Sequence, residues 1–170
     1  CNIYGLDIDE RAYQLAYFSI MMKARQYNRR ILNGSNSCHI YAVQESNNIN
    51  HSHLKFYGES LTFEEKESAE LQMKMLIENF HDAKEYGSIL KIKKYDWNLL
   101  RRYLSKTSEN SQLSFESLGL EETSEKLNNL IDIGEILAQK YWITCTNPPY
   151  LNKKAMNTAV SNYCKKYYPD

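Results

Sequence analysis

The order of the first three predicted elements limits the folds open to this chain. Apolar residues over 3–8 predict a short strand, residues 10–27 have the composition of a helix, and residues 39–43 predict a second strand. Asp9 stands immediately before the helix, where an aspartate is a favourable cap. A strand, a helix and a strand in this order form a βαβ unit with parallel strands. The predicted fold class is therefore α/β.

The spacing of small and apolar side chains predicts which side of the first helix is buried. That side is expected to be formed by Ala12, Leu15, Ala16, Ser19, Met22 and Ala24. A third apolar run, Tyr141-Trp142-Ile143-Thr144-Cys145, lies far downstream and predicts another parallel strand over 141–145. The segment between the second and third strands is too long for a bare connection. We predict one partial domain over 1–170, with a helical insertion over 47–140.

Several helices are expected in and after the insertion. Thr62 and Glu65 form a capping box that predicts a helix to about Tyr86. The remaining predicted segments are a short helix from the Asp96 cap to Leu104, a linker over 106–117, a long helix over 121–140 and a last helix over 154–167.

The charge balance argues against a self-sufficient nucleic-acid binder. Lys plus Arg and Asp plus Glu are each 21, so the net charge is zero, whereas affinity for phosphates needs a basic excess. Local basic clusters occur at Arg29-Arg30, Lys91-Lys93-Lys94, Arg101-Arg102 and Lys165-Lys166. We interpret each as a solvated face that is also able to follow a phosphate backbone once more protein is present.

The cysteines and histidines show no pattern typical of a metal site. Cys1, Cys38, Cys145 and Cys164 lack CxxC spacing, and a His51-Ser52-His53 pair alone is a weak signal. We therefore assign no metal and expect reduced thiols. No apolar run is long enough to span a bilayer, and no signal peptide is visible, so a soluble, cytoplasmic protein with no membrane partner is expected.

Residues Thr146-Asn147-Pro148-Pro149-Tyr150 follow the third apolar run directly. This arrangement suits methylation of an amino nitrogen that is conjugated to a ring or a carbonyl. The Asn147 side-chain oxygen and a main-chain carbonyl on a proline-stiffened turn can accept hydrogen bonds from both N–H groups of such a nitrogen. These hydrogen bonds draw the nitrogen lone pair out of conjugation. Tyr150 then offers a flat face on which an extruded base can stack. The alternative is an ordinary Asn-Pro-Pro turn after a strand.

Two stretches carry a resemblance to a known family. YGLDIDERAYQLAYFSIMMKAR (residues 4–25) and TNPPYLNKKAMN (residues 146–157), with the trailing YYPD, resemble S-adenosylmethionine-dependent adenine-N6 DNA methyltransferases. The similarity is greatest to the large single-chain enzymes of BREX-type phage defence and related restriction-modification systems. It implies an incomplete Rossmann-like methyltransferase sheet, S-adenosylmethionine as cofactor and double-stranded DNA as partner.

The resemblance also implies roles for individual residues. Asp7 would accept hydrogen bonds from the ribose hydroxyls of the cofactor, as suits a carboxylate at the carboxyl end of a parallel strand. Ile8 would pack on the adenine ring of the cofactor, and an acid near Gln44 or Glu45 would contact its amino group. Asn147, Pro148, Pro149 and Tyr150 would form the catalytic loop. Capping of the first helix is the competing role for Asp7 and for Asp9.

The chain also departs from the family pattern. The first strand with its Gly-rich turn is expected before Cys1, and the region that reads the DNA sequence is expected after the catalytic domain; neither is in this chain. We therefore interpret the chain as an internal fragment that is inactive alone and binds the cofactor weakly. In the family's sheet, the first strand lies between the strands that end at Asp7 and at Cys145. Without it, these two strands would have to pair directly, borrow a strand from a neighbouring chain or leave edges that helices cover.

Two other functions remain open on sequence grounds. Methylation of RNA bases or of protein glutamine uses a similar amide-like nitrogen and the same tetrapeptide. A non-catalytic helical interaction module that carries a Pro-Pro turn is the alternative from another class.

Overall fold

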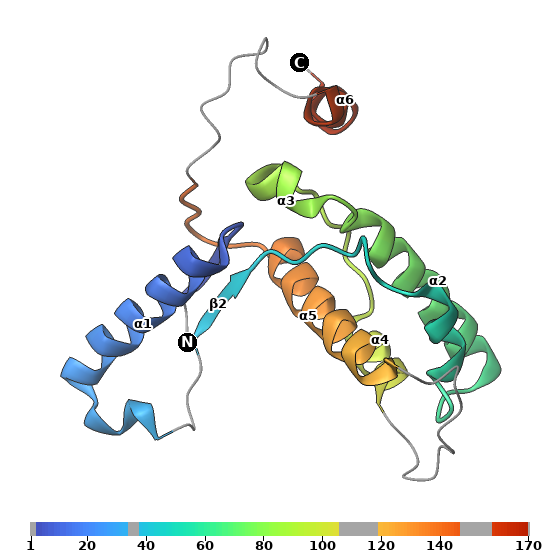
Figure 1. Cartoon of the computed structure of the whole chain (residues 1–170), viewed down its shortest axis with the longest axis horizontal. Coiled ribbons are helices and arrows are strands. Elements are labelled where there is room, and N and C mark those ends of the chain that lie inside the picture. Colours follow the sequence, from blue (N-terminus) through green and yellow to red (C-terminus); the bar gives the residue numbers. More distant parts are fainter. Residues whose placement is uncertain (1–2, 34–37, 106–118, 147–157, 170) are drawn as a thin grey trace. The chain divides into compact units, whose positions relative to one another are not determined.

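The structure is a computed structural model that describes residues 3–33, 38–105, 119–146 and 158–169 (Figure 1). The chain divides into two compact units, Cys1–Gln44 and Glu45–Asp170. Among the described residues, no helix combines the length and the apolar character needed to cross a membrane.

The first unit is the predicted βαβ unit. It contains strand β1 (Tyr4–Asp7), helix α1 (Glu10–Tyr27), a short 3-10 helix η1 (Arg29–Leu32) and strand β2 (His39–Ala42). The strands are parallel, and their register runs from Tyr4 opposite His39 to Asp7 opposite Ala42. Just beyond β2, the Val43 N–H donates to the Asp7 carbonyl at 2.8 Å. The predicted parallel pairing is therefore confirmed, and both strands end at the same edge.

Helix α1 begins and ends where the sequence predicted, but it buries a different side. Its buried residue is Met21, whose Sδ lies 3.3 Å from Cys38 Sγ, and Tyr13 and Tyr17 are half-buried on the same side. Leu15 is 67% exposed and Met22 is also exposed, contrary to the prediction. A two-stranded sheet can cover only one side of a helix, and the side of α1 that is covered carries Tyr13, Tyr17 and Met21. Ala16 and Ser19 are exposed as well, whereas Ala12 and Ala24 are half-buried.

The second unit is helical. It contains 3-10 helix η2 (His51–Phe56), α2 (Phe63–Asn79), α3 (Ala83–Tyr86), 3-10 helix η3 (Gly87–Ile89), α4 (Trp97–Leu104), α5 (Leu120–Ala138) and α6 (Thr158–Tyr167). Helices α2, α4 and α5 pack against one another (Figure 1). Their core includes the fully buried side chains Leu54, Met73, Leu76, Phe80, Leu100, Tyr103, Leu127, Leu130, Ile131 and Ile133.

Close approach of α5 to its neighbours requires a small residue. A Cβ at Gly134 would lie 3.1 Å from Trp97 and 3.2 Å from Leu76, so α5 meets both α4 and α2 there. The buried Tyr103 hydroxyl donates to the Leu54 carbonyl at 2.6 Å and ties α4 to η2.

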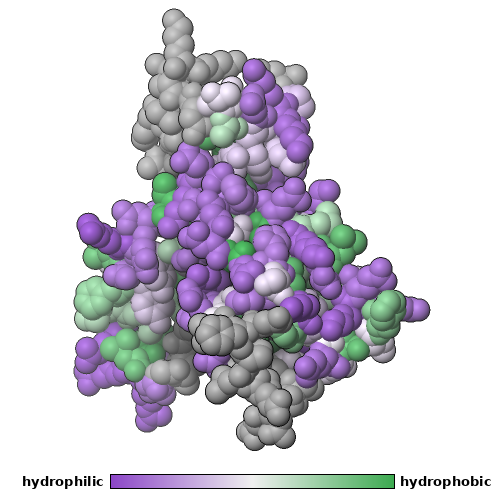
Figure 2. All heavy atoms as spheres, turned by 45° about the vertical axis from the view of Figure 1, so that its right-hand side comes forward, coloured by the Kyte–Doolittle hydropathy of each residue, from purple (hydrophilic) through white to green (hydrophobic). Residues whose placement is uncertain are grey.

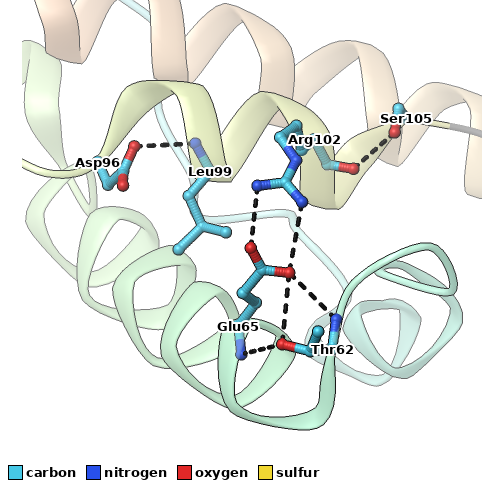
Figure 3. A network of polar contacts seen from close by, with 6 residues as sticks. All are labelled: Thr62, Glu65, Asp96, Leu99, Arg102 and Ser105. Atoms are coloured by element: carbon cyan, nitrogen blue, oxygen red, sulfur yellow. Dashed lines mark hydrogen bonds and ion pairs between the residues drawn. The ribbon is translucent and has the colours of Figure 1, made fainter.

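Polar contacts fix the starts of α2 and α4 (Figure 3). Thr62 and Glu65 form the predicted capping box, and Glu65 also forms an ion pair with Arg102 of α4 at 3.0 Å. The Asp96 carboxylate accepts the Leu99 N–H at 2.9 Å, as an N-cap does. The predicted caps are thus confirmed, and one of them also links two helices.

The helix predicted to reach Tyr86 ends earlier, at Asn79. The helix is interrupted at Asp82, which has a left-handed φ of 53°, and the Asn47 side chain holds this residue by accepting its N–H at 2.9 Å. The helix resumes as α3, which ends before Gly87.

The third predicted strand is absent from the structure. Residues 141–146 have no regular secondary structure, and the sheet formed by the described residues contains β1 and β2 alone. A strand persists only when its backbone pairs with a neighbour, and Trp142 and Ile143 are exposed rather than packed. A Rossmann-like sheet is therefore not seen, although a βαβ unit is compatible with part of one. The predicted linker over 106–117 and residues 154–157 of the last helix lie outside the described residues.

Candidate functional site

Asp7 lies at the carboxyl edge of the two-stranded sheet, as the last residue of β1. Its Oδ1 accepts the Asp9 N–H at 2.8 Å, which holds the carboxylate over the turn into α1. Its side chain is exposed, and Oδ2 makes no hydrogen bond with the residues that the structure describes. Asp7 therefore combines a fixed orientation with an oxygen that is available to a ligand.

Asp9 has the capping role that the sequence predicted. Its Oδ1 accepts the Arg11 N–H at 2.7 Å, and its backbone is extended, as an N-cap requires. The two acids thus differ: Asp9 caps α1, whereas Asp7 supports the preceding turn. Because the Asp7 bond is also local, a purely structural role for this side chain remains the alternative.

Ile8 follows Asp7 in the turn and is 51% exposed. An exposed apolar side chain beside an oriented carboxylate offers one surface for a ring and one acceptor for hydroxyl groups. This pairing matches the chemistry expected for a nucleoside.

The second predicted acid is less clearly placed. Gln44 is half-buried just after β2 and its Nε2 donates to the Ala42 carbonyl at 3.4 Å. Glu45 begins the second unit, is exposed, and accepts the Lys84 N–H at 3.3 Å. The Glu45 carboxylate thus has a structural partner in α3, and its contact with a cofactor stays a prediction.

The predicted catalytic residues Asn147, Pro148, Pro149 and Tyr150 lie outside the described residues. The segment that leads to them is anchored at its start, where the Tyr141 hydroxyl donates to the Ile136 carbonyl of α5 at 3.0 Å. Within the described ranges, no group of three or more His, Cys, Asp or Glu side chains is arranged to hold a metal ion.

The sequence as a whole, residues 1–170, matches the family model of the Eco57I restriction-modification methylase. The chain belongs to this family. It is 32% identical over 170 residues to the adenine-specific methyltransferase PglX of Lacticaseibacillus casei (strain Zhang), covering 99% of this chain and 14% of that protein. It is also 32% identical over 186 residues to the adenine-specific methyltransferase BrxX of Escherichia coli O9:H4 (strain HS), covering 99% of this chain and 15% of that protein.

These matches confirm the resemblance inferred from the two quoted stretches. The Eco57I-family chain spans about one seventh of the length of either relative. The match extends over both Asp7 and the segment 147–150, although no role is thereby assigned to any single residue.

Sequence reasoning missed one group of side chains that the structure brings together. Lysines of the segment 86–95 and of α6 were each interpreted as a separate solvated face, yet tyrosines join the two segments. The signal present in the sequence was the lack of any acid in either segment.

Proposed function

We propose that the protein containing this chain transfers a methyl group from S-adenosylmethionine to N6 of adenine in double-stranded DNA, in restriction-modification or phage defence. The observation that carries the proposal is the match to a methylase family across the whole chain, which includes the NPPY sequence. Both relatives described above are named adenine-specific methyltransferases.

The residues near the sheet edge suit the nucleoside part of the cofactor. S-adenosylmethionine, when bound, supplies an electrophilic methyl group on its sulfonium. Asp7 would accept hydrogen bonds from ribose hydroxyls through its carboxylate, and the exposed Ile8 would pack on the adenine ring. Gln44 or Glu45 would contact the adenine amino group.

The tetrapeptide would act on the target base. The Asn147 side-chain oxygen and the Pro148 carbonyl would each accept a hydrogen bond from one amino N–H, and Pro149 would keep the turn rigid. Tyr150 would stack on the base after it leaves the duplex, a step that costs on the order of a few kcal/mol. In this scheme, catalysis arises from position and preorganised dipoles, and no general base with a shifted pKa is needed.

The decisive experiment is Asn147→Ala in the full-length protein, with transfer of a labelled methyl group to DNA, RNA and protein as the readout. Loss of one preorganised hydrogen-bonding group is expected to reduce turnover on DNA by about 10²-fold or more. Asn128→Ala is the matched control, because Asn128 is an exposed residue of α5 whose amide donates to the Ser124 carbonyl. Near-normal turnover in Asn147→Ala would remove this residue from the mechanism, and labelling of RNA or protein instead of DNA would favour the alternative substrates.

The role of Asp7 has a test of its own. In Asp7→Asn the amide oxygen can still accept the Asp9 N–H, but the negative charge is lost. Loss of a charge-assisted hydrogen bond costs about 1.5–3 kcal/mol. Calorimetry on the full-length protein should therefore show cofactor binding that is at least tenfold weaker. Asp9→Asn is the control, because asparagine caps helices as well as aspartate does. Equal affinity in the two variants would assign Asp7 to the turn alone.

A further inference from the structure

Two segments of the second unit carry lysines and lack acids. Residues 86–95 include Lys91, Lys93 and Lys94, and residues 158–169 include Lys165 and Lys166, with no Asp or Glu in either segment. All five side chains are exposed. Solvated surfaces normally mix both signs of charge, as the balanced composition of the whole chain also does.

Tyrosines of α6 join these two segments. The ring of Tyr163 stacks on Tyr86 with centroids 4.3 Å apart, and its hydroxyl oxygen accepts the Lys91 N–H at 2.8 Å. The Tyr168 hydroxyl donates to the Ile89 carbonyl at 3.0 Å. These contacts place the two groups of lysines on adjoining segments, and Figure 1 shows α6 near α3.

Aromatic rings lie among these lysines. The Tyr167 ring lies 4.5 Å from that of Tyr163, and Lys166 Nζ lies 5.0 Å from the Tyr167 centroid. Lys91 Nζ lies 5.8 Å from the Tyr168 centroid. We call the five lysines, together with the rings of Tyr163, Tyr167 and Tyr168, the lysine–tyrosine surface.

A cleft of about 1120 Å³ borders this surface between α2 and α6. Tyr163, Tyr167 and Lys166 form part of its wall, and the amides of Asn79 and Asn162 line it as well. Lys74 and Glu78 also line the cleft, so its wall carries both signs of charge. The cleft thus offers amide groups beside aromatic rings and the Lys166 cation.

This combination suits a nucleic acid. Lysines neutralise backbone phosphates, and tyrosine hydroxyls and asparagine amides can hydrogen-bond phosphate oxygens. Helix α6 is also the first described element after Asn147–Tyr150, so its surface is tied along the chain to the proposed catalytic residues.

We propose that the lysine–tyrosine surface binds the phosphate backbone of the duplex DNA that flanks the target adenine. This inference rests on the proposed function, because it takes DNA as the substrate. It gives the helical region a role in holding the substrate, in addition to supporting the fold.

The test measures binding of labelled duplex DNA to the full-length protein by fluorescence anisotropy over a series of salt concentrations. The variants are Lys93→Gln with Lys94→Gln, and Lys165→Gln with Lys166→Gln; glutamine keeps the side chain polar at exposed positions. Each lost phosphate contact should reduce the slope of log K against log salt by about 0.9, so each pair should reduce it by about 1.8. The control pair, Lys23→Gln with Lys55→Gln, replaces exposed lysines outside the surface and should leave the slope unchanged.

Failure of this inference can be told apart from failure of the proposed function. If the wild-type protein methylates DNA and both surface pairs keep its salt slope, the lysine–tyrosine surface is not a DNA contact. If the surface pairs reduce the slope but no methyl transfer to DNA occurs, the surface stands and the proposed function fails. A reduced slope with RNA but not with duplex DNA would overturn the assignment to DNA.

Discussion

The two units of the chain differ in how much apolar surface they bury. Among the described residues of the first unit, the buried apolar ones are few: Met21, Ile40, Ala42 and Val43. Large side chains on α1, among them Leu15, Phe18 and Met22, are exposed there. The second unit has a core whose central side chains are completely shielded. Figure 2 shows one face of the molecule, on which hydrophilic residues predominate and hydrophobic residues form separate patches.

This difference follows from the geometry of the two units. One helix on a two-stranded sheet has a single interface to bury, and two strands alone are of marginal stability in water. Three mutually packed helices bury side chains from three directions. We therefore expect the unit that carries Asp7 and Ile8 to be less stable by itself than the unit that carries the lysine–tyrosine surface.

The largest expected effect tests the core of the second unit. Phe80→Ala removes a completely buried ring, and this change typically costs about 3–5 kcal/mol. Hydrogen exchange in the full-length protein should show faster exchange for peptides of α2, α4 and α5. Phe63→Ala is the matched control, because Phe63 is the exposed first residue of α2, whereas Phe80 is the C-cap of the same helix. Similar exchange in the two variants would mean that the core is not cooperative.

The next effect concerns a glycine at the edge of that core. Gly58 has a φ of 76°, and a Cβ there would lie 2.7 Å from the Tyr103 ring. Gly58→Ala therefore combines a left-handed backbone, which costs alanine about 1–2 kcal/mol, with overpacking of about 1–3 kcal/mol. Chemical denaturation followed by a signal from the second unit measures the sum.

Gly119→Ala separates the two contributions. Gly119 also has a positive φ, of 84°, but a Cβ there would meet its nearest neighbour, His53, at 3.7 Å. This variant should show the backbone cost alone. If both alanine variants lose the same stability, Tyr103 moves aside without cost and the core is looser than the structure indicates.

A smaller effect is expected at the capping box of α2. Thr62→Ala removes the side chain that accepts the Glu65 N–H, which typically costs about 1 kcal/mol. Thr62→Ser is the control, because serine can make the same hydrogen bond. A variant with alanine that is as stable as the serine variant would show that α2 does not depend on this cap.

The same box gives a pH dependence. The Thr62 backbone N–H and the Arg102 guanidinium lower the pKa of Glu65 below its ordinary value. A carboxylate whose pKa is lowered by folding stabilises the protein above its unfolded pKa, and this contribution is lost as the pH falls through the lower folded value. Glu65→Gln should therefore be less stable than wild type at neutral pH, and the difference should disappear in acid. A difference that is constant with pH would point to packing rather than charge.

The elements that the sequence predicted well are those with local signals. Asp9, Thr62 and Asp96 each cap a helix within a few residues, so the starts of α1, α2 and α4 agree with the prediction. The parallel pairing of β1 with β2 followed from the order of the elements. In these cases, the contacts that determine the structure join residues that are close together in the sequence, or the order of neighbouring elements is sufficient.

The predictions that failed depended on distant partners. The buried side of α1 depends on which of its side chains contact β1 and β2. The spacing of Leu15 from the other apolar residues of the helix does not reveal this, and Leu15 is exposed. The end of α2 depends on Asn47, which lies far from Asp82 in sequence. A strand over 141–145 needs a neighbour for its backbone, and its apolar composition says nothing about whether one is present.

The candidate site divides in the same way. The resemblance of residues 4–25 to the family pointed to Asp7, which also follows from its place at a predicted strand end, and the structure places it at that edge. The union of the segment 86–95 with α6 depends on Tyr163, whose bond to Lys91 joins residues 72 positions apart. No local pattern contains this information.

The smallest expected effect tests the exposed side of α1. Because the Phe18 ring contacts water in the first unit, Phe18→Ala should change stability by no more than about 0.5 kcal/mol. Hydrogen exchange of α1 peptides in the full-length protein is the measurement, and Met21→Ala, which empties a buried position of the same helix, is the contrast. A loss at Phe18 as large as at Met21 would show that another part of the full-length protein covers this side of α1. The first unit would then depend on that contact for its stability. The two units would differ in how much they rely on other parts of the full-length protein, rather than in how much apolar surface each buries by itself.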